Sequence, residues 1–294
     1  MVIVLLPLSM ALSAQNLQGA EAMDWAKSNV DRLVGHYLSV SGNKLDPDEM
    51  RKELSEIGYD GSNVVFYRDA ERYLVAEAYD RMLKKAYKDN KRSVIILTGP
   101  GASGKSTATK TLDYSNEGLL YDGAFNSYSS LKSAVDRAYA AGMTKVSVIA
   151  VYNDILSCFK NSVERGKRSG RYLGVGYLSN AYKRNAGKLA KLHNEYPEID
   201  ITGIDNSHNN GGRRVDLDQI LKWDFSIDNE TMNRILVFLL HKIDEGDISP
   251  YYYRTVGGDT ADLEDLDDFG QSLADELARR VKNAQSEPNG KLTK

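Results

Sequence analysis

Cysteine and histidine are scarce in this chain, and their scarcity excludes several kinds of site. The 294 residues include one cysteine, Cys158, and four histidines. A single cysteine cannot form an intramolecular disulfide framework or a cysteine-based metal cluster, and no two histidines have the spacing of a zinc-binding helix. This usage is typical of a reducing compartment, so we expect a cytoplasmic protein.

The chain also lacks an excess of charge. Its formal net charge is −3, so no overall basic field favours non-specific binding to nucleic acid. An apolar segment at 1–14 ends in small residues, as a secretory signal does, but it contains no Lys or Arg and is too short to span a bilayer. It is either a signal peptide, a packing segment or an artefact of the gene start, and we expect no membrane span.

One specific motif is present, Gly-Pro-Gly-Ala-Ser-Gly-Lys-Ser at 99–106. It matches the phosphate-binding loop (P-loop) pattern G-x-x-x-x-G-K-[ST]. The apolar run at 93–98 suits a buried parallel strand, and 107–112 can continue as a helix. Glycines let successive backbone N–H groups face one centre, at a helix N-terminus that favours anions. We therefore expect a nucleoside triphosphate, ATP with Mg²⁺, at this loop.

The motif predicts roles for its residues. Lys105 is expected to reach the β- and γ-phosphates, and the Ser106 hydroxyl is expected to bind Mg²⁺. Asn206 follows a later predicted strand, where P-loop kinases often hold the nucleotide base. The predicted nucleotide-binding residues are Gly99, Pro100, Gly101, Ala102, Ser103, Gly104, Lys105, Ser106, Thr107 and Asn206.

Apolar periodicity divides the chain into three parts. Residues 1–92 are predicted to be a helical extension, with a helix over 70–86 that leads towards the motif. Residues 93–245 alternate strands and helices, which predicts a three-layer α/β P-loop fold with a parallel sheet. Residues 246–294 are predicted to be a C-terminal helix and a disordered tail.

After the motif, the same periodicity predicts individual elements. Residues 209–214 are expected to form a loop, and 284–294 a polar tail. The expected elements are strands at 118–121, 145–152 and 199–204 and helices at 131–138, 178–192, 229–243 and 262–283.

The rest of the chain favours a kinase among proteins with this loop. The later predicted strand ends in Ile-Asp-Asn-Ser at 204–207, where a GTPase switch would carry its N-K-x-D motif, and Asp122 is followed by Gly123, where a motor ATPase would carry a glutamate. A small-molecule kinase needs the loop, a carboxylate near the acceptor hydroxyl and a mobile cationic lid. Asp122, at the end of a predicted strand, is the candidate carboxylate, either as the acceptor's base or as a Mg²⁺ ligand. The alternative is a plain Asp-Gly turn.

A cationic stretch between two predicted helices is the candidate lid. Residues 165–171 hold four Arg or Lys residues and two glycines, which would let the segment close. Guanidinium groups stabilise the charge that spreads over a phosphoryl group during transfer. A solvated surface loop is the alternative interpretation. The predicted catalytic residues are Lys105, Asp122, Arg165, Arg168 and Arg171.

Residues 93–207, about two-fifths of the chain, resemble the zeta toxin family of P-loop kinases. The resemblance rests on the loop motif, on LYDGAFNSY at 120–128 and on RGKRSGR at 165–171. It implies transfer of a phosphoryl group from ATP to a sugar hydroxyl of UDP-N-acetylglucosamine, with Lys105, Asp122 and the three arginines in catalytic roles. It also implies an antitoxin protein as a partner.

The chain departs from that family between the loop helix and Asp122. This segment is too short for the extra strand and helix that usually carry the family's acceptor-binding aspartate, which leaves the acceptor site unassigned. The alternatives to a sugar-nucleotide kinase are a polynucleotide-end kinase and a non-catalytic nucleotide-binding module.

Overall fold

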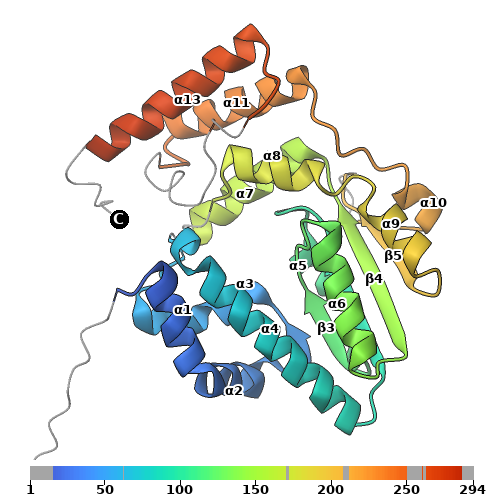
Figure 1. Cartoon of the computed structure of the whole chain (residues 1–294). Helices are drawn as coiled ribbons and strands as arrows, with labels where there is room; N and C mark the ends of the chain where they lie inside the picture. Colours follow the sequence, from blue (N-terminus) through green and yellow to red (C-terminus); the bar gives the residue numbers. More distant parts are fainter. Residues whose placement is uncertain are drawn as a thin grey trace, which may run out of the picture.

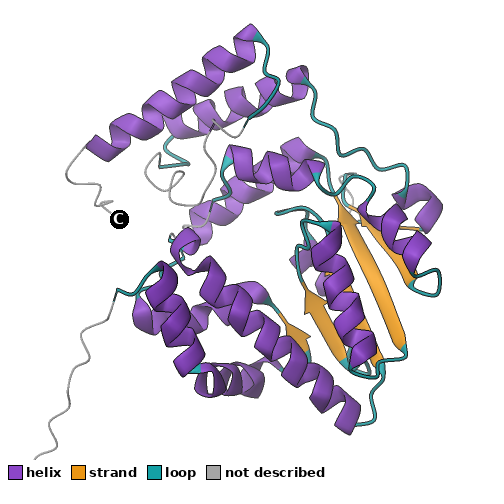
Figure 2. Cartoon of the chain, viewed as in Figure 1, coloured by secondary structure: helices purple, strands orange, loops and turns teal. Residues whose placement is uncertain are grey.

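The computed structural model describes residues 16–61, 63–169, 172–207, 212–249, 260 and 263–286. These residues contain a six-stranded sheet in the order β1-β3-β2-β4-β5-β6, drawn as orange arrows in Figure 2. The expected α/β class is confirmed, and the sheet, predicted to be parallel, is parallel at every strand pair except β5 and β6. The strands are β1 (Lys44–Leu45), β2 (Ser93–Thr98), β3 (Leu119–Asp122), β4 (Lys145–Tyr152), β5 (Asp200–Asp205) and β6 (Arg213–Val215).

Two strands were not predicted from the sequence. The segment expected to be a loop at 209–214 ends in β6, which pairs antiparallel with β5. Gly203 of β5 makes this pairing compact, because a Cβ there would lie 2.5 Å from the Cγ2 atom of Val215. The loop prediction is therefore wrong for Arg213 and Arg214, and the sheet is mixed at this edge.

The other unpredicted strand, β1, comes from the segment predicted to be entirely helical. It pairs in parallel with β3, with Leu45 opposite Tyr121. A two-residue strand leaves no alternation of apolar and polar residues to detect, which is why the periodicity missed it. One apolar core also runs from α1 to β5, across the boundary expected at residue 93.

Helices surround the sheet (Figure 1). Before β2 they are α1 (Gly19–Ser28), α2 (Val30–Ser41), α3 (Pro47–Met50), the 3₁₀ helix η1 (Arg51–Ile57) and α4 (Val64–Lys88). Between β2 and β5 they are α5 (Lys105–Thr109), α6 (Tyr128–Ala140), α7 (Ile155–Ser169), α8 (Val175–Lys183) and α9 (Lys188–Glu195). After β6 they are α10 (Leu217–Ile220), α11 (Asn229–Asp244) and α13 (Asp268–Ser286).

The two faces of the sheet are covered by different helices. Helices α4 and α6 share one core with alternate residues of β2 and β4, and the Tyr79 hydroxyl of α4 donates to the Ala134 carbonyl of α6 at 2.8 Å. The buried stripe predicted within 70–86 lies on α4 and faces this core. The opposite face packs Leu97, Leu120 and Ile149 with Ala108 of α5. Helices on both faces are compatible with a three-layer α/β fold.

The helix predicted over 178–192 is wrong, because the structure divides it into α8 and α9. The side-chain amide of Asn185 donates to the Ala181 carbonyl at 2.7 Å and closes α8. Gly187 follows with a φ of 66°, a left-handed conformation that ends helices. The new helix then begins at Lys188.

The C-terminal helices α11 and α13 pack together with α7 in a second apolar core, seen at the top of Figure 1. Helix α11 matches the prediction within one residue, whereas α13 begins at Asp268 and continues to Ser286, into the segment expected to be a tail. The remaining tail residues, 287–294, and the apolar segment at 1–14 lie outside the described residues. Within the described ranges, every helix is too short or too polar to cross a bilayer.

Candidate nucleotide-binding site

The predicted site residues converge because the parallel strands end at one edge of the sheet. Residues 99–104 leave the end of β2, Asp122 is the last residue of β3, and Asn206 follows β5. The β2–β3 register places Leu97 opposite Asp122, so the loop begins two residues beyond this carboxylate. Ligands of open parallel sheets bind outside such carboxyl ends.

The loop backbone has the conformation that its glycines allow. Gly99 and Gly104 have φ values of 146° and 97°, and Ala102 has a φ of 59°. A Cβ at Gly99 would lie 2.2 Å from the Val151 carbonyl oxygen, so the chain can pass β4 this closely only without a side chain. Two of the pattern's fixed glycines are thus required by the geometry of the turn.

Lys105, Ser106 and Thr107 form the first turn of α5, directly after this loop. The Lys105 ammonium group donates to the carbonyls of Gly99 and Pro100, at 3.0 and 2.8 Å. Burial lowers the pKa of Lys105, and the charge of Asp122 opposes this shift. The amine is therefore held over the loop, where an anion would replace neutral carbonyl partners with charged ones.

Two asparagines hold the loop from neighbouring elements. The Asn206 amide donates to the Ser103 carbonyl at 2.8 Å, and the Asn161 amide of α7 donates to the Ala102 carbonyl at 3.0 Å. Asn206 thus supports the loop backbone, and its expected contact with nucleotide stays a prediction. Asn161 was not predicted, since an asparagine on a polar helix face carries no signal of its distant partner.

Asp122 is buried and has two partners that tie it to other elements. Its Oδ2 atom lies 2.9 Å from the Lys44 ammonium group at the start of β1 and 3.4 Å from the Thr109 hydroxyl of α5. The hydrogen bonds and charges of Asp122 and Asp46 outweigh the effect of burial and raise the pKa of Lys44. Lys44 was missed because its position in the sheet depends on the unpredicted strand.

The predicted Mg²⁺ residues, Ser106 and Asp122, offer the right donor chemistry. Both are oxygen donors, which Mg²⁺ prefers, and Ser106 is exposed at the start of α5. Within the described ranges, no three His, Cys, Asp or Glu side chains gather in a metal-binding group. Ser106 and Asp122 therefore fit a Mg²⁺ ion that arrives bound to phosphates, because such an ion keeps several water ligands and needs few ligands from the protein.

The cationic stretch begins on a helix and not in a loop, because α7 continues to Ser169. Gly166 is buried there, and a Cβ on it would lie 2.2 Å from the Tyr172 ring, so this glycine serves packing and not flexibility. Arg165 lies near the loop, where its charge contributes to the lowered pKa of Lys105. The exposed Arg168 side chain donates to the Glu164 carbonyl at 3.2 Å. Arg171 lies outside the described residues.

A buried lysine beside the loop was also missed. Lys188, the first residue of α9, is 2% exposed, and its ammonium group contacts the Thr98 hydroxyl, the Phe125 carbonyl and the Asn185 side-chain carbonyl at 2.8, 2.7 and 2.6 Å. Burial, assisted by the charge of Lys105, lowers the pKa of Lys188 to about 7. A lysine on a predicted helix indicates an exposed face, so no sequence signal marks it.

No model of a known protein family matches the chain, and no curated protein matches it either.

Proposed function

We propose that this protein is an ATP-dependent, Mg²⁺-dependent phosphotransferase with a P-loop kinase fold, which phosphorylates a hydroxyl group of a small molecule. One observation supports this most strongly. Lys105 begins α5 after a loop with three residues of positive φ, and the buried Asp122 ends β3, the strand next to the one from which that loop departs. A cation on the transferred phosphate and a carboxylate beside it are what transfer to an alcohol requires.

Each residue has a role in the proposed reaction. The loop N–H groups and Lys105 bind the β- and γ-phosphates, and Arg165 adds positive charge where charge develops in the transition state. Ser106 and Asp122 would hold Mg²⁺, which neutralises phosphate charge when bound. Asp122 alternatively accepts the acceptor's proton, the second role predicted for it.

The resemblance of residues 93–207 to zeta toxins supplies the acceptor class in this proposal. It points to a UDP-amino sugar as substrate, to a cytoplasmic site of action and to an antitoxin as partner. Arg168 and Arg171 take part as the family's lid arginines would. These points rest on the resemblance alone.

The proposal is tested by incubating the full chain with labelled ATP and a set of acceptors. The set contains UDP-N-acetylglucosamine, N-acetylglucosamine, uridine and an oligonucleotide with a 5′-hydroxyl end. We expect label to appear on a sugar compound, with Lys105→Ala as the inactive control. Transfer to the oligonucleotide alone would indicate a polynucleotide-end kinase. Tight ATP binding without transfer to any acceptor would indicate a binding module and contradict the proposal.

A further inference from the structure

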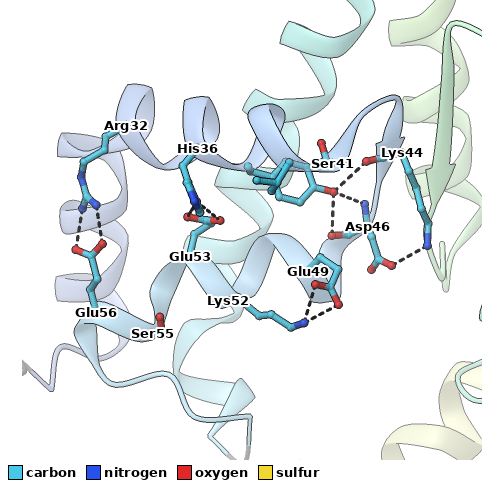
Figure 3. Close-up of a pocket in the computed structure, with 12 residues that line it drawn as sticks. Arg32, His36, Ser41, Lys44, Asp46, Glu49, Lys52, Glu53, Ser55 and Glu56 are labelled. Carbon is cyan, nitrogen blue, oxygen red and sulfur yellow. Dashed lines mark hydrogen bonds and ion pairs between the residues drawn. The ribbon is translucent and has the colours of Figure 1, made fainter.

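A cavity of about 630 Å³ lies beside the candidate nucleotide site, in the N-terminal part of the chain (Figure 3). Residues of α2 line one side of it, and residues of β1, α3 and η1 line the other. Its lining includes Lys44, the first residue of the two-residue strand β1, and Asp46, which directly follows that strand. Because β1 and β3 are parallel, Asp46 lies at the same edge of the sheet as Asp122 and the loop at 99–104.

Sheet register connects this cavity to Asp122. Lys44 lies opposite Leu120 in the β1–β3 pair, and side chains two residues apart along a strand share a face. Lys44 and Asp122 are therefore on one face, the same face that α5 covers. The Lys44 ammonium group lies 3.0 Å from Oδ2 of Asp46 and 2.9 Å from Oδ2 of Asp122. One cation thus spans a carboxylate of the cavity and the carboxylate beside the loop.

Asp46 is held firmly in the cavity wall. Its Oδ1 atom accepts the Asp48 N–H at 3.0 Å and caps α3, where Pro47 occupies the first helical position. Its own N–H donates to the Tyr37 hydroxyl at 2.7 Å, and that hydroxyl donates to the Lys44 carbonyl at 3.1 Å. The carboxylate is therefore fixed from α2 and from α3 before any ligand enters.

The charges that line the cavity favour a ligand without net charge. Each basic side chain of the lining already has a carboxylate partner in the lining, as the dashed lines in Figure 3 show. The pairs are Arg32–Glu56, His36–Glu53, Lys52–Glu49 and Lys44–Asp46. A polyanion such as nucleic acid would meet these carboxylates without a spare cation. Hydroxyl groups, in contrast, can donate to carboxylates and accept from ammonium groups.

We propose that this cavity is the acceptor site, that it takes a neutral polyhydroxyl group such as a sugar ring, and that Asp46 contacts the hydroxyl that is phosphorylated. The proposal rests on the proposed function for its reaction. In that reaction the acceptor oxygen forms a bond to the γ-phosphorus of ATP, the bond from that phosphorus to the bridging oxygen breaks, ADP leaves, and Asp46 takes the hydroxyl proton.

The electrostatics of Asp46 suit this role. Burial raises the pKa of Asp46, and the charge of Lys44 opposes this shift. A carboxylate with a raised pKa is a stronger base at neutral pH, which general-base catalysis favours. Asp122 then remains with Lys44 and the loop, on the phosphate side of the site.

The first test is Asp46→Asn, with Asp48→Asn as the matched control. Asparagine caps a helix about as well as aspartate, so the substitution keeps the fold and removes the charge. We expect kcat for sugar phosphorylation to fall at least about 100-fold in Asp46→Asn, with ATP affinity unchanged. Asp48→Asn, with the same charge change two residues away, should keep its kcat. Equal kcat in Asp46→Asn and the original chain would overturn the role of Asp46.

The second test locates the ligand without requiring catalysis. Val40 lines the cavity and is 71% exposed, and Cys158 is buried, so iodoacetamide should react with a Val40→Cys variant at position 40. Val237→Cys on α11, at a site 47% exposed, is the control. We expect N-acetylglucosamine and UDP-N-acetylglucosamine to slow the reaction at position 40 and not at position 237. The 5′-hydroxyl oligonucleotide should protect neither position.

These measurements separate the acceptor site from the proposed function. If no compound is phosphorylated but a sugar protects position 40, the proposed function fails and the cavity assignment is supported. If a sugar is phosphorylated and position 40 reacts at an unchanged rate, the assignment of the cavity is overturned. Absence of both phosphorylation and protection overturns both proposals, and protection by the oligonucleotide overturns the ligand class.

Discussion

Each of the two flanks of the loop at 99–104 contains a lysine, and the pKa values of these two lysines are shifted in opposite directions. On the β1–β3 flank, Lys44 lies between two carboxylates, and its pKa is raised. On the α9 flank, Lys188 has three neutral oxygen partners, and burial lowers its pKa to about 7. Both amines are largely removed from water, so the difference lies in the charge of their partners. A lysine beside this loop is therefore not a fixed positive charge.

The largest effect is expected at the lysine between these flanks. Lys105→Ala removes the charge over the loop carbonyls and should reduce phosphoryl transfer by at least about 10²–10³-fold, because charge on the γ-phosphate grows in the transition state. Transfer is measured with labelled ATP, and circular dichroism checks the fold. Turnover near that of the original chain would remove Lys105 from the mechanism.

The next effect is on stability at the α9 flank. Lys188→Met leaves three oxygen acceptors without their donor in a buried place, and we expect the free energy of unfolding to fall by about 2–4 kcal/mol. Urea unfolding measures the change. Lys191→Met, on the exposed face of the same helix, is the control and should change stability little. Equal stability of the two variants would show that the three contacts of Lys188 are not needed.

A smaller effect is expected at the β1–β3 flank. Lys44→Met leaves Asp46 and Asp122 without their shared cation, but the Lys44 side chain is 24% exposed, so water compensates in part. We expect a loss of about 1–3 kcal/mol in the free energy of unfolding, measured in urea at neutral pH. Lys44→Arg keeps the charge and should recover much of the loss. If Lys44→Arg were as unstable as Lys44→Met, the shape of the Lys44 side chain and not its charge would account for the stability.

Per pH unit, the effect of Lys188 titration on stability is small, and it distinguishes the two flanks. The pKa of Lys188, about 7, lies below its ordinary value of 10.5, so between these pH values the unfolded chain holds a proton that the folded chain lacks. The stability from Lys188 is therefore complete above pH 10.5 and is lost as the pH falls towards 7. The slope is at most about 1.4 kcal/mol per pH unit. Unfolding from pH 7 to 9 should show it in the original chain and not in Lys188→Met, and the same slope in both would contradict the lowered pKa.

Local pattern was sufficient for the parts of the site that depend on the backbone. The motif at 99–106 directly follows the apolar run of β2, and Asp122 is the last residue of the apolar run of β3. Strand periodicity and glycine spacing are local properties, so the loop, its flanking strand and helix, and the place of Asp122 at a strand end were predictable.

Predictions from local sequence were wrong where side-chain contacts determine the role of a residue. Gly166 was interpreted as a hinge, yet it is a buried helical position that makes room for the Tyr172 ring. The segment over 178–192 has the apolar period of one helix, but the Asn185 amide closes the first half and Gly187 turns the chain. The Tyr172 ring, outside α7, determined the first outcome, and the side-chain hydrogen bond of Asn185, together with the backbone of Gly187, determined the second. Apolar periodicity contains no information about either.

The sequence alone was enough to predict an α/β chain with a glycine-rich loop before a helix, because apolar periodicity, glycine conformation and a lysine after the turn are encoded within short segments. Tertiary structure alone brought Lys44 and Asp46 to Asp122, and Lys188 beneath Thr98. Lys44 and Asp46 precede Asp122 by 78 and 76 positions, and Lys188 follows Thr98 by 90 positions. Only the pairing of β1 with β3 and the docking of α9 bring such distant charges together, and their pKa values follow from that contact.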